Sequence, residues 1–491
     1  MPEYIMTFDI GTTSLKAALI NNAGHLVAEG CASYSVSHPQ PGWAEQNPDE
    51  IWQQIGIASQ QVIVQSGVSS SEIRAVIFVA PWKNIIALDA KGQLLHNSII
   101  WMDARAHEQA ERLNQSIGQE VGSGQEYWPR LMWLKEQQPE LWRQAAHIVG
   151  LNTYFKFRAT GELYTEPSDD FIRSENPELQ AYYQSILKAA SLAEDIDKFP
   201  PARAVTDTIG HVTHHAAEQL GLCSGTPVIN GFGDLVAIAW GAERSQLHDA
   251  HIYFGTSSWL VNIIQQRSQL PAPLYFSVSA QQEGAVYALQ TGCLALDWII
   301  DQVYHAERKQ LGSGIYQFVQ EEVGQIPPGS EGLIATHWLT GELAPFKKNA
   351  KGTFLNLTTR HDRRHMVRAM MESVCFTHRH NMTTLEKLTG QPRESIRVVG
   401  GGAINTLWMQ MLADILQIRV EVPGSPRYSG TLGAYYCAAR GLGWGLTQQN
   451  TSQHAFVPNP AWSEVYLKNY RIYMQIYPAL KEIYNQLNGE Y

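Results

Sequence analysis

The sequence lacks any apolar run that approaches the roughly 18 residues needed to cross a bilayer, and no signal-peptide pattern precedes Ile5. Basic residues are in the minority, because 36 lysines and arginines stand against 46 aspartates and glutamates and leave a net charge of −10. This balance argues against nucleic acid or an anionic membrane as the main partner. We therefore expect a soluble, cytoplasmic protein with no nucleic acid and no membrane among its partners.

Cysteine is also scarce. The five cysteines are far apart in a chain of 491 residues, and no two of them stand in a CxxC pair. An odd, scattered set favours buried, reduced thiols over a disulfide or zinc framework. The rest of the composition, 44% hydrophobic and 17% charged, is typical of a globular protein, and the length predicts two large domains or more.

Two apolar runs near the N-terminus, Ile5–Phe8 and Leu15–Ile20, flank the polar turn Gly11–Ser14 and predict a β-hairpin. Asp9 ends the first run, where a strand directs its last side chain toward a ligand. Gly11 allows close approach of the backbone, and the turn adds donors from Thr12, Thr13 and Ser14. A carboxylate beside uncharged donors is what a phosphate chain with Mg²⁺ requires. The alternative is an ordinary hairpin with a polar turn.

Lys16 lies in the second strand, just beyond this turn. It can reach a phosphate, or it can remain an exposed strand lysine.

A second β-turn-β pattern repeats the first in the middle of the chain. His251–Phe254 and Trp259–Ile264 are its predicted strands, and Gly255-Thr-Ser-Ser258 is its turn. A strand over 226–230, the turn Gly231-Phe-Gly-Asp234 and a helix over 235–240 come before it. Two hairpins with Gly-Thr at the tip form a weak internal repeat that could hold a phosphate chain from both sides. We expect an N-terminal domain over 1–244 and a C-terminal domain over 245–491.

Glycine also marks two helix starts in the second half. Thr291-Gly292 precedes a predicted helix, and Gly400-Gly-Gly402 links a strand over 396–399 to a helix that reaches Ile415. Bare backbone before a helix N-terminus suits an adenine or a ribose. The triplet does not match the dinucleotide fingerprint G-x-G-x-x-G, so a Rossmann fold is disfavoured.

The remaining expected elements follow from hydrophobic periodicity. Met102-Asp-Ala-Arg-Ala106 is predicted to open a helix that runs to about residue 113. The others are a buried strand over 75–80, a surface loop over 336–345, a close-packed helix over 430–441, and amphipathic helices over 48–65, 363–388 and 462–487.

Together these motifs resemble the FGGY family of carbohydrate kinases, with most similarity to its xylulokinase-like members. The resemblance covers nearly the whole chain and implies an α/β fold of two ribonuclease-H-like (actin-like ATPase) domains with an interdomain cleft. It places the sugar mostly on the first domain and ATP on the second. The motifs, in the family's order, are Asp9-Ile-Gly-Thr-Thr-Ser-Leu-Lys16, Gly42-Trp-Ala-Glu-Gln-Asn-Pro48, Trp101-Met-Asp-Ala-Arg-Ala106, Gly231-Phe-Gly-Asp234, Gly255-Thr-Ser-Ser258, Gly341-Glu-Leu-Ala-Pro345 and Gly400-Gly-Gly-Ala-Ile-Asn405.

Carried over by position, the resemblance implies an ATP-dependent kinase with Asp234 as catalytic base, and with Asp9 and Asp234 at Mg²⁺. The partner is a small-molecule sugar, and the formation of a homodimer is left open. The implied nucleotide contacts are Gly11, Thr12, Thr13, Lys16, Gly255, Thr256, Gly292, Gly401, Gly402 and Asn405. The implied sugar contacts are Trp82, Lys83, Asp103 and Asp234.

Several of these residues have a second interpretation. Asp234 could simply cap a helix, and Asp103 could form a structural ion pair with Arg105. Lys83 could bind the carboxylate of an acidic sugar or lie along the surface as a snorkelling lysine. Trp82 could stack on a sugar ring or pack in the core.

Two departures from the family pattern affect the expected substrate. Pro81-Trp-Lys-Asn84 stands where xylulokinases usually carry Gln-Met-His-Gly, and Leu235 follows Asp234 where they carry Asn. Both places normally hydrogen-bond sugar hydroxyls, so selectivity can shift by orders of magnitude. We expect a ketopentose such as D-xylulose, with a sugar acid such as gluconate or an alditol as alternatives. A non-catalytic sugar sensor and another actin-fold ATPase are more distant alternatives.

Overall fold

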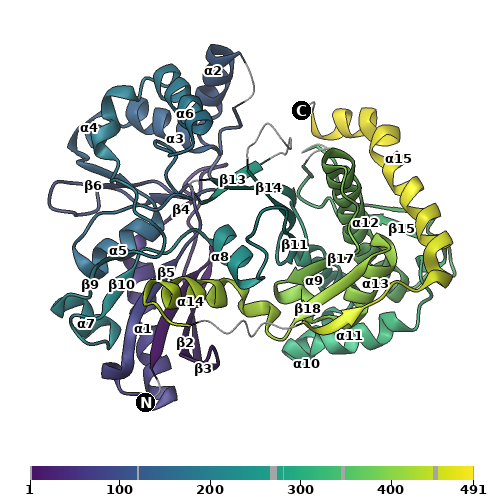
Figure 1. Cartoon of the computed structure of the whole chain (residues 1–491). Helices are drawn as coiled ribbons and strands as arrows, with labels where there is room; N and C mark the ends of the chain where they lie inside the picture. The colour runs from purple at the N-terminus through teal and green to yellow at the C-terminus, as the bar shows by residue number, and fades with distance from the viewer. Residues whose placement is uncertain are drawn as a thin grey trace. The chain divides into compact units, whose positions relative to one another are not determined.

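The computed structural model describes residues 3–118, 121–265, 274–279, 281–343, 349–445 and 452–489. The chain divides into two compact units, each built on a β-sheet with helices around it (Figure 1). Unit 1 comprises 1–241, 277–282 and 430–449, and unit 2 comprises 242–276, 283–429 and 450–491. Across these described ranges, every helix is too short or too polar to cross a membrane.

Unit 1 contains a six-stranded sheet in the order β3-β2-β1-β5-β10-β9. β1 and β2 pair antiparallel from Tyr4↔Asn21 to Ile10↔Leu15, which confirms the predicted hairpin. β1, β5 and β10 are parallel, whereas β3 and β9 run antiparallel to their neighbours. The strands are β1 (Tyr4–Ile10), β2 (Ser14–Asn21), β3 (Leu26–Ser33), β5 (Ile73–Val79), β9 (Thr208–His211) and β10 (Pro227–Ile229).

Helix α1 (Pro48–Ser66) packs against β2 and β3 of this sheet. The Asn47 side chain caps its first turn, and Gly67 ends it with a φ of 65°, in the left-handed region that glycine adopts without strain. The sheet and α1 enclose one hydrophobic core, in which Phe8 and Phe78 stack at 5.1 Å between ring centroids. The predicted helix over 48–65 and strand over 75–80 are therefore confirmed.

A second core in unit 1 belongs to a helical region between β5 and β9 that includes Trp128 and Phe171. Two short sheets, β4 (Glu45–Gln46) with β7 (Ser98–Ile99) and β6 (Ile86–Leu88) with β8 (His147–Val149), accompany it. The other helices of the unit are α2 (His107–Ile117), α3 (Tyr127–Gln137), α4 (Pro139–Gln144), α5 (Leu151–Thr160), α6 (Pro177–Ala189), α7 (His214–Leu220), α8 (Asp234–Gly241) and α14 (Ser429–Gly441).

Unit 2 contains a seven-stranded sheet in the order β13-β14-β12-β11-β17-β18-β19. β14, β12 and β11 are antiparallel neighbours, β11, β17 and β18 are parallel, and β19 is antiparallel at the edge. From β14 to β19 this order and these strand directions repeat those of the first sheet, with β13 as an additional edge strand, so the internal repeat predicted from the two Gly-Thr hairpins is confirmed. The strands are β11 (Ala250–Phe254), β12 (Ser258–Ile264), β13 (Leu274–Ser279), β14 (Gln282–Leu289), β17 (Ser395–Val399), β18 (Arg419–Pro423) and β19 (Ser452–Phe456).

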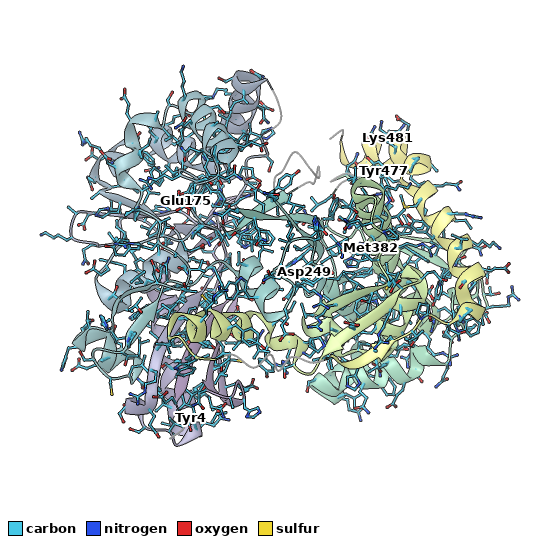
Figure 2. The ribbon with its side chains drawn as sticks, viewed as in Figure 1. Tyr4, Glu175, Asp249, Met382, Tyr477 and Lys481 are labelled. Carbon is cyan, nitrogen blue, oxygen red and sulfur yellow. The ribbon has the colours of Figure 1, made fainter. Side chains whose placement is uncertain are left out.

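One hydrophobic core joins the sheet of unit 2 to its helices. Met382 of α12 and Tyr477 of α15, both labelled in Figure 2, belong to this core. A short sheet of β15 (Ile334–Thr336) and β16 (Thr353–Leu355) packs against α12. The main helices are α9 (Cys293–Val303), α10 (His305–Leu311), α11 (Ile315–Gly324), α12 (Arg363–Thr389), α13 (Thr406–Leu416) and α15 (Ser463–Asn488).

Three expectations about local structure were wrong. The helix predicted to open at Met102 begins at His107, so the Asp103 motif lies in the preceding turn. The predicted surface loop over 336–345 is buried at Thr336, His337 and Trp338, because Trp338 packs against two tyrosines of α15; Ala344 and Pro345 lie outside the described residues. All five cysteines are free thiols, as predicted, but the Cys31 thiol is exposed on β3 rather than buried.

Candidate active site

The turn of the first hairpin is tightly closed. The Gly11 amide donates to the Ser14 carbonyl at 2.8 Å, and a Cβ at Gly11 would lie 3.0 Å from that same oxygen. The Tyr34 hydroxyl lies 2.6 Å from the Gly11 carbonyl and 3.1 Å from the Ser14 carbonyl, to which it donates. Burial raises the pKa of Tyr34, and the charge of Asp9 adds to the rise, so the phenol stays a donor at neutral pH.

The two threonines of the turn differ in exposure. Thr12 is half-buried, with the Trp101 indole donating to its hydroxyl at 3.2 Å and the Gln46 amide donating to its carbonyl at 2.5 Å. Thr13 is exposed at the tip. Of the two threonines, Thr12 therefore has a hydroxyl held by Trp101, and Thr13 has an exposed hydroxyl.

Asp9 and Asp234 interact within unit 1. Asp9 lies in β1, opposite Lys16 of β2, and a Cβ built at Gly430 would lie 2.6 Å from its Oδ2. Burial raises the pKa of Asp9, and Lys16 opposes this rise. Burial also raises the pKa of Asp234 to about 7, and the negative charge of Asp9 adds to the shift. A carboxylate with a pKa near neutrality is suited to accept a proton.

Asp234 lies at the N-terminus of α8, the position that suggested a capping role. It is the first residue of α8, and its Oδ1 accepts a hydrogen bond from the Leu235 amide at 2.9 Å. Its own amide donates to the Ala80 carbonyl at 3.2 Å, just beyond β5. Capping and proton transfer are compatible, because the carboxylate has a second oxygen.

Trp82 lies beside Gly233, the residue that precedes Asp234, and Lys83 follows it in the chain. A Cβ at Gly233 would be 3.8 Å from the Trp82 Cβ. Lys83 has a φ of 59°, which non-glycine residues rarely adopt. Its amide donates to Asp169 Oδ1 at 2.8 Å, and its carbonyl accepts from Arg130 at 2.6 Å. Strain of this kind persists only where the surroundings over-determine it, and it is concentrated at functional sites.

The Lys83 side chain is buried and paired. Its ammonium lies 2.7 Å from Glu126 Oε2 and 4.5 Å from the Trp82 ring centroid. Only 9% of the residue is exposed, so the interpretation as a snorkelling surface lysine was wrong. Its charge is balanced by a neighbouring carboxylate.

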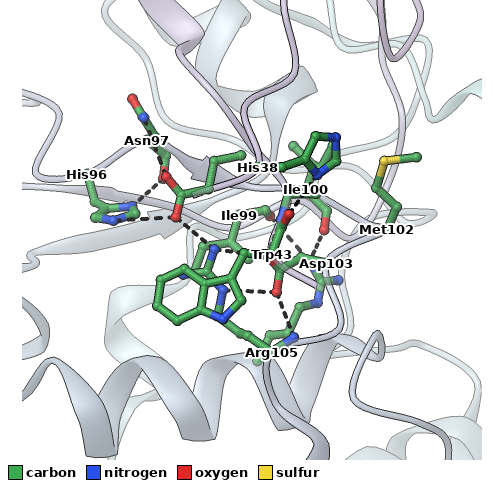
Figure 3. Close-up of polar contacts among 12 residues, drawn as sticks. His38, Trp43, His96, Asn97, Ile99, Ile100, Met102, Asp103 and Arg105 are labelled. Carbon is green, nitrogen blue, oxygen red and sulfur yellow. Dashed lines mark hydrogen bonds and ion pairs between the residues drawn. The ribbon is translucent and has the colours of Figure 1, made fainter. Parts of the chain in front are cut away.

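The predicted sugar residue Asp103 is fully hydrogen-bonded (Figure 3). Its carboxylate accepts from the Ala44 amide at 2.6 Å, and from the Arg105 amide and guanidinium at 2.8–3.0 Å. Arg105 also donates to Glu45 at 2.7 Å and lies over the Trp43 ring, 3.8 Å from its centroid. Asp103 and the Arg105 side chain are both inaccessible to solvent. The structure therefore contains the structural ion pair that was the alternative interpretation of Asp103.

The glycine turns of unit 2 come together. The Gly292 amide donates to the Thr256 carbonyl at 2.8 Å, and the Cys293 amide donates to the Gly255 carbonyl at 2.7 Å. Added Cβ atoms at Gly292 and Gly400 would lie 2.8 Å and 2.5 Å from backbone oxygens of this turn region. A Cβ at Gly401 would meet no described atom within 4 Å, so this glycine borders open space. The Asn405 side chain caps α13.

The comparisons with known proteins agree with this arrangement. The pattern of the N-terminal domain of the FGGY family of carbohydrate kinases matches residues 4–241, and that of the C-terminal domain matches residues 250–442. The chain belongs to the FGGY family of carbohydrate kinases. As a member of this family it is a phosphotransferase, and its two units have the actin-like ATPase fold that the sequence predicted.

Individual relatives differ in the substrate that their names state. The chain is 26% identical to a xylulose kinase of Bacillus subtilis (strain 168), over 99% of both proteins. It is 25% identical to a gluconokinase of Bacillus licheniformis, over 99% of this chain and 98% of the relative. The solved structure of a ligand-bound xylulose kinase from Lactobacillus acidophilus has a TM-score of 0.85 at 24% identity, and the match covers 99% of this chain and all of that one.

Sequence reasoning missed the buried residues that support Asp234. Ser168 accepts a hydrogen bond from the Gly233 amide at 2.9 Å and donates to Glu166 Oε1 at 2.7 Å. The Lys156 ammonium interacts electrostatically with Glu166 and donates a hydrogen bond to the Asn230 side chain at 2.5 Å. The stretch Thr165-Glu-Pro-Ser-Asp-Asp170 lies in a largely polar part of the sequence, so only the fold, which buries Glu166, Ser168 and Asp170, shows that these side chains need partners.

The residues of this kinase fit the groups that its reaction requires. Mg²⁺ is commonly bound by one or two carboxylates together with water and phosphate oxygens, so a cluster of three ligands is not needed. No cluster of three metal-binding side chains occurs among the described residues. Asp9 and Asp234 are two mutually repelling carboxylates that a divalent cation would stabilise. Open space borders Gly401, where a nucleotide can lie, whereas the amides of Gly255 and Gly292 already donate to the Ser257 and Thr256 carbonyls.

Proposed function

We propose that this kinase transfers the γ-phosphoryl group of ATP to a hydroxyl of a small sugar, with Asp234 as general base. The observation that carries the proposal is the pairing of Asp234 with Asp9, which together with burial raises the pKa of Asp234 to about 7. A base with this pKa is about half ionised near pH 7, and its ionised form accepts a proton readily. The cytoplasmic location and the state of oligomerisation stay predictions.

Each residue has a proposed role in positioning, because phosphoryl transfer depends on alignment and charge neutralisation. Asp234 removes the proton of the attacking hydroxyl, and Asp9 keeps the pKa of Asp234 high. Both carboxylates would hold Mg²⁺, which neutralises phosphate charge when it is bound. The proposed phosphate contacts are Gly11, Thr12, Thr13, Lys16, Gly255 and Thr256. The proposed nucleoside contacts are Gly292, Gly401, Gly402 and Asn405.

The domain assignment follows from these roles. We assign the acceptor and the base to the domain over 1–244, and the nucleotide to the domain over 245–491. In the sugar site we assign direct contact to Trp82 and Lys83. Asp103 supports the site indirectly, because its carboxylate is occupied by Ala44 and Arg105.

A neutral acceptor, most simply a ketopentose such as D-xylulose, fits the charge of this region. The Lys83 ammonium is compensated by Glu126 at 2.7 Å, so a sugar carboxylate would have to compete for it. The buried guanidinium of Arg130 donates to four backbone carbonyls, at Lys83, Ile99, Ile100 and Glu126. Buried charges that are already paired add little affinity for a new ion. The xylulose kinase relatives are consistent with this choice.

A sugar acid is the second candidate acceptor. Lys83 supports it, because its ammonium lies over the Trp82 ring and would need only to exchange Glu126 for the sugar carboxylate. The gluconokinase relative makes the same suggestion at similar identity.

The test is a phosphorylation screen of ketoses, alditols and aldonates with Mg²⁺ and ATP. We expect a ketopentose to give the highest kcat/KM. Asp234→Asn should lower kcat by a factor of about 10² to 10⁴, the usual contribution of a general base. The matched control is Asp197→Asn, which alters an exposed aspartate of the same unit. Wild-type activity in Asp234→Asn would refute the assignment of the base, and turnover of no polyol would refute the kinase assignment.

A further inference from the structure

A buried pair of ionisable side chains in unit 2 has no role in the reaction as described so far. His337 and Glu342 lie in the loop that follows β15, and their side chains are 0% and 1% exposed. His337 Nε2 lies 2.9 Å from Glu342 Oε2. Burying two charged groups is expensive unless each is well hydrogen-bonded, so the other contacts of the pair show what it supports.

Both residues hold the segment that leads into Gly292. Glu342 Oε1 accepts a hydrogen bond from the Gln290 amide at 3.0 Å, and the Thr291 hydroxyl donates to the His337 carbonyl. Thr291 is itself fully buried. Two successive residues are therefore attached to one loop, directly before a glycine proposed to line the nucleotide site.

The segment has little freedom on its other side. The Gly292 amide donates to the Thr256 carbonyl, and a Cβ at Gly292 would lie 2.8 Å from the Gly255 carbonyl. Any displacement of residues 290–292 would thus move the Gly255-Thr256 turn. The Glu342 carboxylate is connected in this way to both proposed nucleotide-binding turns.

The pair is anchored on its far side to α12. His337 Nδ1 lies 3.2 Å from the Ser373 hydroxyl, whose own hydrogen is donated to the Met370 carbonyl at 2.7 Å. Ser373 therefore accepts a hydrogen bond from His337 Nδ1, and the Glu342 carboxylate lies against the Nε2 edge of the ring. This arrangement fixes the imidazole ring, so that its position transmits the geometry of α12 to the loop.

We propose that Glu342 and His337 are positioning residues for the nucleotide end of the active site. They hold Gln290 and Thr291 so that the Gly292 and Gly255-Thr256 backbone keeps the shape that a nucleoside diphosphate requires. The inference rests on the proposed function, because it assumes that nucleotide binds at these turns. This positioning role does not require either residue to contact the nucleotide.

The experiment compares Glu342→Ala and Thr291→Val with the wild-type chain. Each variant should weaken ADP binding, measured by titration calorimetry, and raise the KM for ATP by about tenfold, which corresponds to about 1.4 kcal/mol. The KM for the sugar should stay unchanged, a separation that a general loss of structure would not produce. Glu342→Gln keeps an oxygen that can accept from the Gln290 amide, so it should recover part of the affinity.

Glu482→Ala, which removes an exposed carboxylate on α15 of the same unit, is the matched control and should bind ADP normally. Circular dichroism checks that each variant is folded, and Thr291→Val, which removes a single hydroxyl, decides the matter if Glu342→Ala does not fold. Folded variants that bind ADP with wild-type affinity would overturn the positioning role. A wild-type chain that binds no ADP would instead overturn the proposed function.

Discussion

At Asp234, burial and the charge of Asp9 act on the same carboxyl group and in the same direction. Both disfavour the ionised form, which raises its pKa to about 7. Only the deprotonated carboxylate can accept the hydroxyl proton, so the active fraction falls as the pH falls through this value. We predict that kcat/KM for Mg²⁺–ATP, which reports the enzyme before the metal binds, is constant above pH ~7.5 and decreases about tenfold per pH unit below pH ~6.5. The measurement is a pH–rate profile over pH 5–9.

The control for this prediction is the pH–rate profile of the Asp9→Asn variant, measured on its residual activity. Removing the negative charge of Asp9 should move the acidic limb of the profile to lower pH, while the part of the shift due to burial remains. A limb that stays in place in Asp9→Asn would mean that another group controls the rate. A wild-type limb near pH ~4, the ordinary aspartate range, would contradict the raised pKa.

Lys83 and Glu126 form the pair that we expect to set the preference between neutral and acidic sugars. In Glu126→Gln the buried ammonium loses its counter-charge while the side-chain shape is kept. An unpaired buried cation should then attract a carboxylate, and a charge-assisted hydrogen bond contributes roughly 1.5–3 kcal/mol. We predict that the ratio of kcat/KM for an aldonate to that for a ketopentose rises by a factor of about 10 or more.

Glu136→Gln is the matched control for this specificity change. Glu136 lies on α3, the helix that Glu126 directly precedes, but it pairs with the half-exposed Arg112 side chain, so its loss should leave the ratio unchanged. An unchanged ratio in Glu126→Gln itself would show that Lys83 does not face the acceptor.

The sequence predicted site residues where the signal is local. Asp9 ends an apolar run two residues before Gly11, and Asp234 directly follows Gly233, patterns that a short window contains. Ser168 and Glu126 could not be found in this way, because the groups they contact lie 65 and 43 residues away in the chain. Hydrogen bonds across such separations depend on the packed fold.

At the scale of elements, α14 and α8 approach each other through Gly433. A Cβ at this position would lie 1.8 Å from the Ala237 carbonyl oxygen and 2.9 Å from the Gly241 amide nitrogen, both of which are backbone atoms. Overpacking of a close contact costs typically about 1–3 kcal/mol and occasionally more. We predict that Gly433→Val lowers the free energy of unfolding by about 3 kcal/mol, measured by chemical denaturation.

Gly445→Ala is the control for this change, because a Cβ there would meet no described atom within 4 Å. It should leave the denaturation midpoint unchanged. Equal midpoints for Gly433→Val and the wild-type chain would show that α14 can move away from α8 without loss. The small-residue pattern over 430–441 predicted this close packing correctly.

The types of the elements were predictable where the hydrophobic periodicity is strong. The burial of loops was not predictable from the sequence. Helices α1, α12 and α15 begin and end within a few residues of their predicted limits. The loop after β15 reads as polar and proline-bearing, yet Trp338 is buried against Tyr473 and Tyr477 of α15. Those partners lie more than a hundred residues away, where no local pattern can indicate them.

At the scale of the whole molecule, the two sheets repeat one order of strands, and each carries a Gly-Thr hairpin at the same position. Composition alone predicted only two large domains. The fold class came from the motifs, because they recur in a fixed order along nearly the whole chain. The division of roles between the units therefore needs a measurement that reports on both at once.

Hydrogen exchange on the intact chain provides that measurement. Because a bound ligand suppresses local opening of the segments it contacts, we predict that ADP slows exchange in unit 2, at residues 255–258, 290–293 and 400–405. The preferred sugar should slow exchange in unit 1, at residues 81–84, 166–170 and 232–235. At a ligand concentration of 100 Kd, each ligand stabilises the state that binds it by about 2.7 kcal/mol, enough to lower the opening fraction about a hundredfold. Sugar protection confined to unit 2, or ADP protection confined to unit 1, would reverse the proposed assignment of the domains.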